Sequence, residues 1–238
     1  MKTMKLAIVT AACALAACNF ANAAFNGTFT SVVGGAPTEG GRINFDDLTG
    51  PGLATGPNGS VNVSFITDGQ VVTSGSPNTS RYAAPWLSGA NGTGFGNTVP
   101  GVDTTTYLTS GTGLGRAILT FGSDQTYLGL LWGSIDTYNT LEFYNNGQMV
   151  DSLTGTQVIS KTTYPVPFPA GNQQINGTAY VNIYTGFAFD EVRAASTSSY
   201  AFEFDNIAVV PEPTTVVAGA LLLLPFGAST LRSLRRKA

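Results

Sequence analysis

The chain has 238 residues, enough for one or two domains, and only 11% of them are charged. It is rich in Gly, Thr, Ser and Asn, which suits short strands joined by turns and argues against long amphipathic helices. All fourteen carboxylates lie between Glu39 and Glu212, whereas six of the eleven basic residues lie in the two ends. The part between the ends is therefore acidic, which argues against nucleic acid as a partner and favours solubility outside the cell.

Residues 1–23 have the three parts of a secretory signal peptide. Two lysines precede an apolar stretch from Leu6 to about Ala17, and Ala21-Asn22-Ala23 follows as a cleavage site. We expect a signal helix that engages the secretion translocon and signal peptidase, with cleavage between Ala23 and Ala24. A competing interpretation is that Leu15-Ala16-Ala17-Cys18 resembles a bacterial lipobox, in which Cys18 would be lipidated.

The residues that most enzymes use for nucleophilic catalysis are missing after that cleavage. The chain has no His, and both cysteines, Cys13 and Cys18, lie in the signal segment. Ser-His-Asp sites, Cys-His sites and His-ligated zinc are therefore excluded, and we do not expect an enzyme. A glycoside hydrolase needs only two carboxylates and stays open as a less favoured alternative. Its candidate acids are Asp136, Glu142, Glu191 and Glu203.

Residues 24–209 show apolar alternation broken by turns, which predicts an all-β domain. Eleven short strands without a helix between them favour an antiparallel β-sandwich of jelly-roll type, and we expect helices only at the two ends of the chain. The predicted strands are residues 28–33, 42–46, 61–66, 70–74, 116–122, 126–133, 139–144, 148–153, 178–185, 187–195 and 200–210.

Two short connections predict hairpins, because Asp-Gly and Asn-Gly tolerate the positive φ angles of tight turns. These are Thr67-Asp68-Gly69 and Asn145-Asn146-Gly147. Residues 76–112 are too polar and Gly-rich for a core strand and predict a long surface excursion. Two aromatic residues of this excursion, Tyr82 and Trp86, are candidate contacts for a sugar, since flat rings stack on the apolar faces of pyranoses.

A motif of Phe, Asp and a second acidic or amide residue occurs three times, at residues 45–47, 189–191 and 204–206. In jelly rolls the first and last strands often lie side by side, which would bring Asp46, Asp47 and Asp205 together. Hard cations such as Ca²⁺ prefer sets of oxygen ligands of this kind, so these three are candidate ligands of a structural calcium ion. The alternative is that the phenylalanines fill the core while the acids face water.

The chain ends in Val210-Pro211-Glu212-Pro213, an apolar run from Thr214 to Leu231, and a basic cluster. The run is near the lower limit for a transmembrane helix, and the basic residues would stay in the cytoplasm. This arrangement resembles the PEP-CTERM sorting signal of Gram-negative bacteria. The resemblance implies that exosortase, a membrane protease, recognises Pro211, Glu212 and Pro213, and that the inner membrane holds residues 210–238 only transiently.

Residues 130–141, together with a Phe-Asp-Asn strand before the tag, resemble one family of exosortase-dependent surface proteins that has no assigned activity. Within this stretch, Asp136 and Asn139 are expected to cap a turn. Proteins with the PEP-CTERM tag generally accompany exopolysaccharide production. The resemblance therefore implies a structural protein of the cell surface or extracellular matrix, linked to biofilm. The alternative is a carbohydrate-binding module supported by calcium.

Overall fold

The structure is a computed structural model that describes residues 24–212, apart from 58, 74–80, 97–99 and 164–167. The described part is mostly β-strand, which confirms the all-β class. Its helices are α1 (Gly155–Lys161) and the 3₁₀ helix η1 (Ile175–Gly177). The strands are β1 (Gly27–Val32), β2 (Gly41–Ile43), β3 (Gly52–Gly56), β4 (Gly59–Ile66), β5 (Gln70–Val72), β6 (Trp86–Leu87), β7 (Gly101–Val102), β8 (Tyr107–Thr109), β9 (Arg116–Gly133), β10 (Asn139–Asn145), β11 (Gln148–Thr154), β12 (Thr162–Thr163), β13 (Ala179–Ser196) and β14 (Glu203–Pro211).

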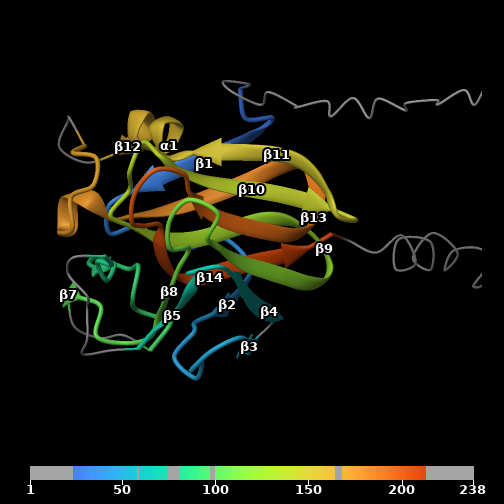
Figure 1. Ribbon diagram of the computed structural model, residues 1–238, viewed down its shortest axis with the longest axis horizontal. Coiled ribbons are helices and arrows are strands. Elements are labelled where there is room, and N and C mark those ends of the chain that lie inside the picture. Colours follow the sequence, from blue (N-terminus) through green and yellow to red (C-terminus); the bar gives the residue numbers. More distant parts are fainter. Residues whose placement is uncertain (1–23, 58, 74–80, 97–99, 164–167, 213–238) are drawn as a thin grey trace, which may run out of the picture.

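Two strands of 18 residues, β9 and β13, form the centre of a twelve-stranded sheet (Figure 1). They pair with each other in antiparallel register, interrupted by shifts between Tyr184 and Glu191. In the first part of β9, residues 116–120 also pair with β4, and the part of β13 that faces them pairs with β10. In the second part, residues 125–133 of β9 pair with β14, and the facing part of β13 pairs with β1. The two long strands therefore belong to two groups of neighbours.

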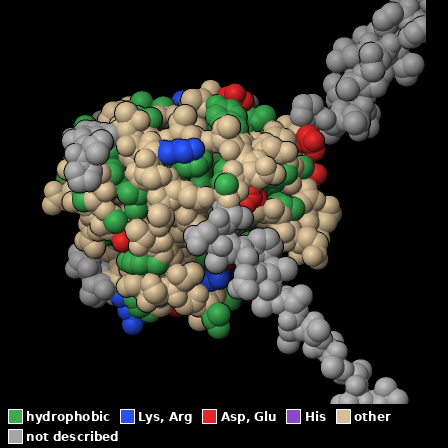
Figure 2. All heavy atoms as spheres, turned by 90° about the horizontal axis from the view of Figure 1, so that it is seen from above, with side chains coloured by type: hydrophobic (Ala, Val, Ile, Leu, Met, Phe, Trp, Pro, Cys, Tyr) green, Lys and Arg blue, Asp and Glu red, His purple; other side chains and the backbone are tan. Residues whose placement is uncertain are grey.

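One hydrophobic cluster contains residues from both groups of strands. Phe143 of β10 and Phe189 of β13 come from the first group, and Trp132 of β9 and Phe204 of β14 come from the second. All four side chains are 0–1% exposed. The alternation that predicted strands supplies this core, as in β10, where every second residue from Asn139 to Phe143 is buried. Figure 2 shows a surface of mostly uncharged side chains and backbone, on which single charges and hydrophobic side chains are scattered.

The prediction from the sequence finds most strands but divides the two longest. Residues 116–122 and 126–133 are one strand, β9, and residues 178–185 and 187–195 are one strand, β13. The polar residues between the predicted pairs lie where the register shifts, so the backbone continues through them. The apolar segment 127–132 lies between β13 and β14, as its two apolar faces predicted.

Of the two predicted hairpins, one is confirmed and one is wrong. Asn145 pairs with Gln148 across the turn, and Asn146 and Gly147 have the positive φ angles of 50° and 74° that the sequence predicted. The turn at residues 67–69 exists, but β4 pairs with β3 and β9, whereas β5 pairs with β8. The turn therefore connects two strands that pair with different partners and not with each other.

The helix α1 was not predicted, because helices were expected only at the chain ends. Thr154 caps it by a reciprocal capping box with Gln157. The sheet is also not purely antiparallel, since β1 pairs with β12 in parallel. Within the described stretch from 24 to 212, no helix is long and apolar enough to cross a membrane. The predicted signal helix and the predicted helix from Thr214 lie outside the described residues.

The predicted surface excursion, residues 76–112, packs on the sheet where the structure describes it. Leu87 and Phe95 form a cluster with Leu131 of β9 and Tyr180 of β13. This cluster covers the face of the two long strands that is turned away from the main core. The excursion also contains β6, β7 and β8, of which β8 pairs with β14.

Candidate functional site

The Pro-Glu-Pro motif begins inside the last strand. Val210 pairs with Tyr127 and Pro211 with Gln125, and the Glu212 N–H donates to the Asp124 carbonyl at 2.8 Å. Proline is tolerated here because the strand ends at this residue. The side chains of Pro211 and Glu212 are exposed, and Pro213 lies outside the described residues. The strand thus crosses the expected domain boundary at residue 210, and Ala24 at the other end is exposed.

The first and last Phe-Asp motifs lie side by side, as the sequence predicted. Strand β2 pairs with β14, and the rings of Phe45 and Phe204 meet edge to face at 5.9 Å between centroids. Phe45, Phe189 and Phe204 all fill the core. Asp46 and Asp47 are exposed, in agreement with the alternative interpretation of these acids, whereas Asp205 is fully buried.

The carboxylate beside Asp205 comes from the excursion rather than from Asp47. Asp103 is 4% exposed and lies within hydrogen-bond reach of Asp205. Burial, followed by the charge of Asp103, raises the pKa of Asp205 well above its usual value. The charge of Asp46 raises it by a smaller amount. Its own oxygens accept hydrogen bonds from the Asn44 side chain at 2.8 Å and the Thr106 N–H at 3.3 Å.

The predicted three-acid calcium site is not assembled as expected. In the part of the chain that the structure describes, no three Asp, Glu, His or Cys side chains are grouped closely enough to hold a metal ion together. What the fold brings together is the pair Asp103 and Asp205, with Asp46 nearby. A sequence signal for Asp103 was absent, because it lies in a polar segment that resembles an exposed loop.

The four candidate acids of a glycoside hydrolase lie in two places. Glu142 and Glu191 are both close to Arg193, and Asp136 lies close enough to Glu203 to raise its pKa. Glu142 pairs with Arg116 at 3.3 Å, and Glu191 pairs with Arg193 at 2.6 Å. Each of these two carboxylates is therefore the partner of a basic side chain. Burial raises the pKa of Asp136, which lies beside the turn at Asn139.

Glu203 is the most perturbed of these acids and is closed to substrate. It is 1% exposed, and burial raises its pKa to about 8. One carboxyl oxygen accepts from the Ala83 N–H at 3.0 Å, and the other has no hydrogen-bond partner. A raised pKa suits a general acid, but a sealed carboxyl group cannot reach a glycosidic oxygen.

The two aromatic candidates for sugar contact differ in how far their rings are buried. Tyr82 is 5% exposed, accepts a hydrogen bond from Gln70 at 2.7 Å and packs against Tyr200. Its ring therefore offers no free face to a ligand, which does not fit the predicted contact. The Trp86 side chain is half-buried, and the backbone N–H of Trp86 donates to the Thr178 hydroxyl at 3.1 Å, which fixes β6 to the residue before β13.

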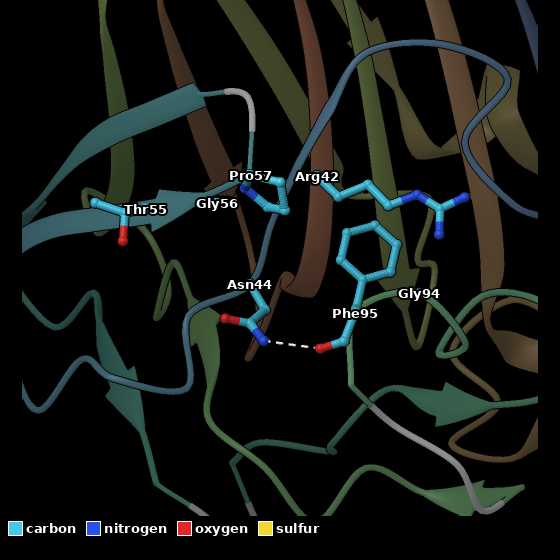
Figure 3. A pocket seen from close by; sticks show the side chains of 7 residues that line it. All are labelled: Arg42, Asn44, Thr55, Gly56, Pro57, Gly94 and Phe95. Carbon is cyan, nitrogen blue, oxygen red and sulfur yellow. Dashed lines mark hydrogen bonds between the residues drawn. The ribbon is translucent and has the colours of Figure 1, made fainter.

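A surface pocket of about 240 Å³ lies where β2 and β3 meet the excursion (Figure 3). Arg42, Asn44, Thr55, Gly56, Pro57, Gly94 and Phe95 line it. Figure 3 shows Asn44 directing its amide nitrogen to the Phe95 carbonyl, which accepts at 2.9 Å. Gly56 is required, because a Cβ there would lie 1.7 Å from the Arg42 carbonyl oxygen.

One residue that lines the pocket, Arg42, is positively charged and forms no ion pair with any of the described residues. The Arg42 guanidinium lies 5.4 Å from the centroid of the Phe95 ring and donates to the Thr93 carbonyl at 3.3 Å. The ion pairs of the described residues involve Arg116 and Arg193 instead. Sequence reasoning missed this pocket, since nothing in the spacing of Arg42 and Phe95 indicates that they meet.

Comparison with known proteins does not assign the chain: no family model matches it, and neither a curated protein nor a solved structure is significantly similar.

Proposed function

We propose that this chain is an exported, non-enzymatic β-protein that exosortase sorts to the cell surface or the extracellular matrix. Signal peptidase removes residues 1–23, the inner membrane holds the C-terminal segment transiently, and the protein serves a structural role linked to exopolysaccharide. In this proposal the fold is a jelly-roll-like sandwich. The sharing of β9 and β13 by two groups of strands, and the single core cluster between those groups, support this arrangement.

The observation that carries the proposal is the position of the tag. The Pro-Glu-Pro motif follows the last core residues of β14 directly, and its first two side chains are exposed. Cleavage on the C-terminal side of Glu212 would leave every described strand intact. The domain therefore remains folded after release, as a sorting signal requires.

The same geometry implies that recognition must open a short backbone pairing. The Glu212 N–H is bonded to the Asp124 carbonyl, and Pro211 is aligned with Gln125. A protease that reads the motif has to lift these residues from the end of β9. The Glu212 hydrogen bond contributes on the order of 1 kcal/mol, so the motif lies at an end of the sheet that can open at low cost.

The test is the mass of the mature protein from hosts with and without exosortase. With the enzyme, we expect loss of the segment after the motif, and Pro211→Ala or Glu212→Ala should preserve the uncut form. Asp124→Ala is the matched control, because Asp124 contacts Glu212 only through its backbone carbonyl. A mature wild-type protein that still carries Leu221 to Leu224 would refute the sorting proposal.

A second candidate function is carbohydrate binding at the pocket of Arg42. Sugar hydroxyls both donate and accept, and the pocket offers the Arg42 donors, the Thr55 hydroxyl and the amide oxygen of Asn44, whose own hydrogen bonds use its nitrogen. A glycan array with the wild type, Arg42→Gln and Thr55→Val tests it, with Arg81→Gln as the control far along the excursion. Equal binding by wild type and Arg42→Gln would exclude this pocket.

A further inference from the structure

The contact between Asp103 and Asp205 leaves three buried carboxylate oxygens without a hydrogen-bond partner. These are one oxygen of Asp103 and both oxygens of Asp205. The remaining oxygen of Asp103 accepts from the Thr105 N–H at 2.8 Å and from the Thr105 hydroxyl at 2.6 Å. The Thr105 contacts fix the Asp103 side chain beside Asp205 and leave its second oxygen without a partner.

Such a pair is unstable if both groups are charged and nothing lies between them. Burying one carboxylate without a partner costs several kcal/mol, and a second like charge at hydrogen-bond distance adds repulsion. The described residues place no Lys or Arg in an ion pair with either acid. The negative charge of Asp46 near the pair increases the attraction for a positive species. A shared proton or a cation must therefore compensate the pair.

We propose that Asp103 and Asp205 bind a calcium ion that fastens the excursion to the last strand. The unpartnered groups are all oxygens, and a hard cation with flexible coordination suits two carboxylates completed by neutral oxygens and water. Asp46 contributes charge, while its hydrogen bonds to Asn44 and Thr106 keep its side chain occupied. The site needs two carboxylates rather than three, in keeping with the absence of a three-acid cluster among the described residues.

The ion would join two segments that are distant in sequence, with the charge of Asp46 on a third segment nearby. Asp205 lies in β14, Asp103 lies between β7 and β8, and Asp46 follows β2. Because β8 and β2 both pair with β14, calcium would stabilise the side of the sheet where these strands meet. The inference is independent of the sorting tag, which is six residues beyond Asp205 in sequence and outside this contact.

Thermal unfolding of the purified protein at pH 7, in calcium or in EDTA, tests the proposal. Calcium at about 100 times its Kd should raise Tm by about 5–10 °C, since a ligand that binds only the folded state stabilises it by mass action. Asp205→Asn and Asp103→Asn should abolish this shift. Both are isosteric and remove a buried charge, so each variant should melt higher than the wild type in EDTA.

Asp190→Asn is the matched control, because Asp190 occupies the same place in its Phe-Asp motif but accepts from the Asn146 N–H at 3.0 Å. It should keep the full calcium shift. Terbium provides a second readout, since Trp132 on β9 pairs with Phe204, next to Asp205, and should sensitise its luminescence. Identical melting in calcium and EDTA, or an undiminished shift in Asp205→Asn, would overturn the proposal; the first result would leave a shared proton as the compensating species.

Discussion

The burial of the Glu203 side chain makes the stability of the domain depend on pH. Its carboxyl group is 1% exposed, and burial raises its pKa to about 8 from 4.5. The folded state therefore retains a proton that the unfolded state releases above pH 4.5. The stabilisation is complete below pH 4.5 and is lost as pH rises toward 8, by about 1.4 kcal/mol for each pH unit at most. With no cation bound, Asp205 contributes in the same direction.

Glu203→Gln removes this titration while it keeps an oxygen that can accept from the Ala83 N–H. We expect the variant to be more stable than the wild type at pH 8, by roughly 4 kcal/mol at most, and nearly equal to it at pH 4.5. Urea unfolding at the two pH values measures the difference. Glu191→Gln is the control on the ion-paired surface, and an equal effect of Glu203→Gln at both pH values would contradict the argument.

Asn139 is a second side chain whose contribution to stability depends on its buried environment. It is fully buried, accepts from the Asp136 N–H at 2.9 Å and the Trp132 indole at 3.4 Å, and donates to the Ala201 carbonyl at 2.9 Å. Asn139→Ala leaves these partners unsatisfied and should cost about 3 kcal/mol of unfolding free energy. Asn145→Ala loses a half-buried bond to the Ala188 carbonyl and an exposed bond from the Asn146 side chain, and it should cost less than about 1 kcal/mol. Equal losses in chemical denaturation would contradict a capping role for Asn139.

Among the secondary-structure elements, the β10–β11 hairpin and helix α1 depend on glycine for different reasons. Gly147 has a positive φ of 74° and open space where a Cβ would lie. A Cβ on Gly155, at the start of α1, would lie 1.9 Å from the Asp136 carbonyl oxygen. We expect Gly147→Ala to cost about 1 kcal/mol of conformational strain, whereas Gly155→Ala should displace the helix or the turn and cost several-fold more. Equilibrium unfolding of the two variants measures the contrast, and a larger loss for Gly147→Ala would contradict it.

The two turns show which structural features depend on local sequence and which depend on distant contacts. The Asn146-Gly147 turn and the alternation in β10 are local, so the sequence predicts this hairpin correctly. The turn at Thr67-Asp68-Gly69 carries similar residues, yet its flanking strands pair with β9 and β8 instead of with each other. Pairing partners depend on which strand edges are available in the complete sheet. A turn motif therefore indicates a change of direction more securely than a hairpin.

For the domain as a unit, β14 is the strand that closes the fold. Ending the chain after Glu212 should leave Tm unchanged, because every described strand is kept. Ending it after Asn206 removes the three residues that pair with β2, including the buried Ile207 and Val209, and should abolish cooperative unfolding. Calorimetry on both truncated chains checks this, and a folded product of the shorter chain would show that β14 is not essential.

The sequence alone predicts an all-β class, most strand positions, and the resemblance of the C-terminal segment to a sorting tag. These follow from local alternation, turn chemistry and motif order, which do not require knowledge of distant contacts. Other features depend on how the excursion packs against β14 and the long strands. These are the burial of Asp205 beside Asp103, the burial of Glu203 and Tyr82, and the contact of Arg42 with Phe95. Each of these joins residues far apart in the chain. Their chemistry arises from desolvation and proximity, and both exist only once the sheet has formed.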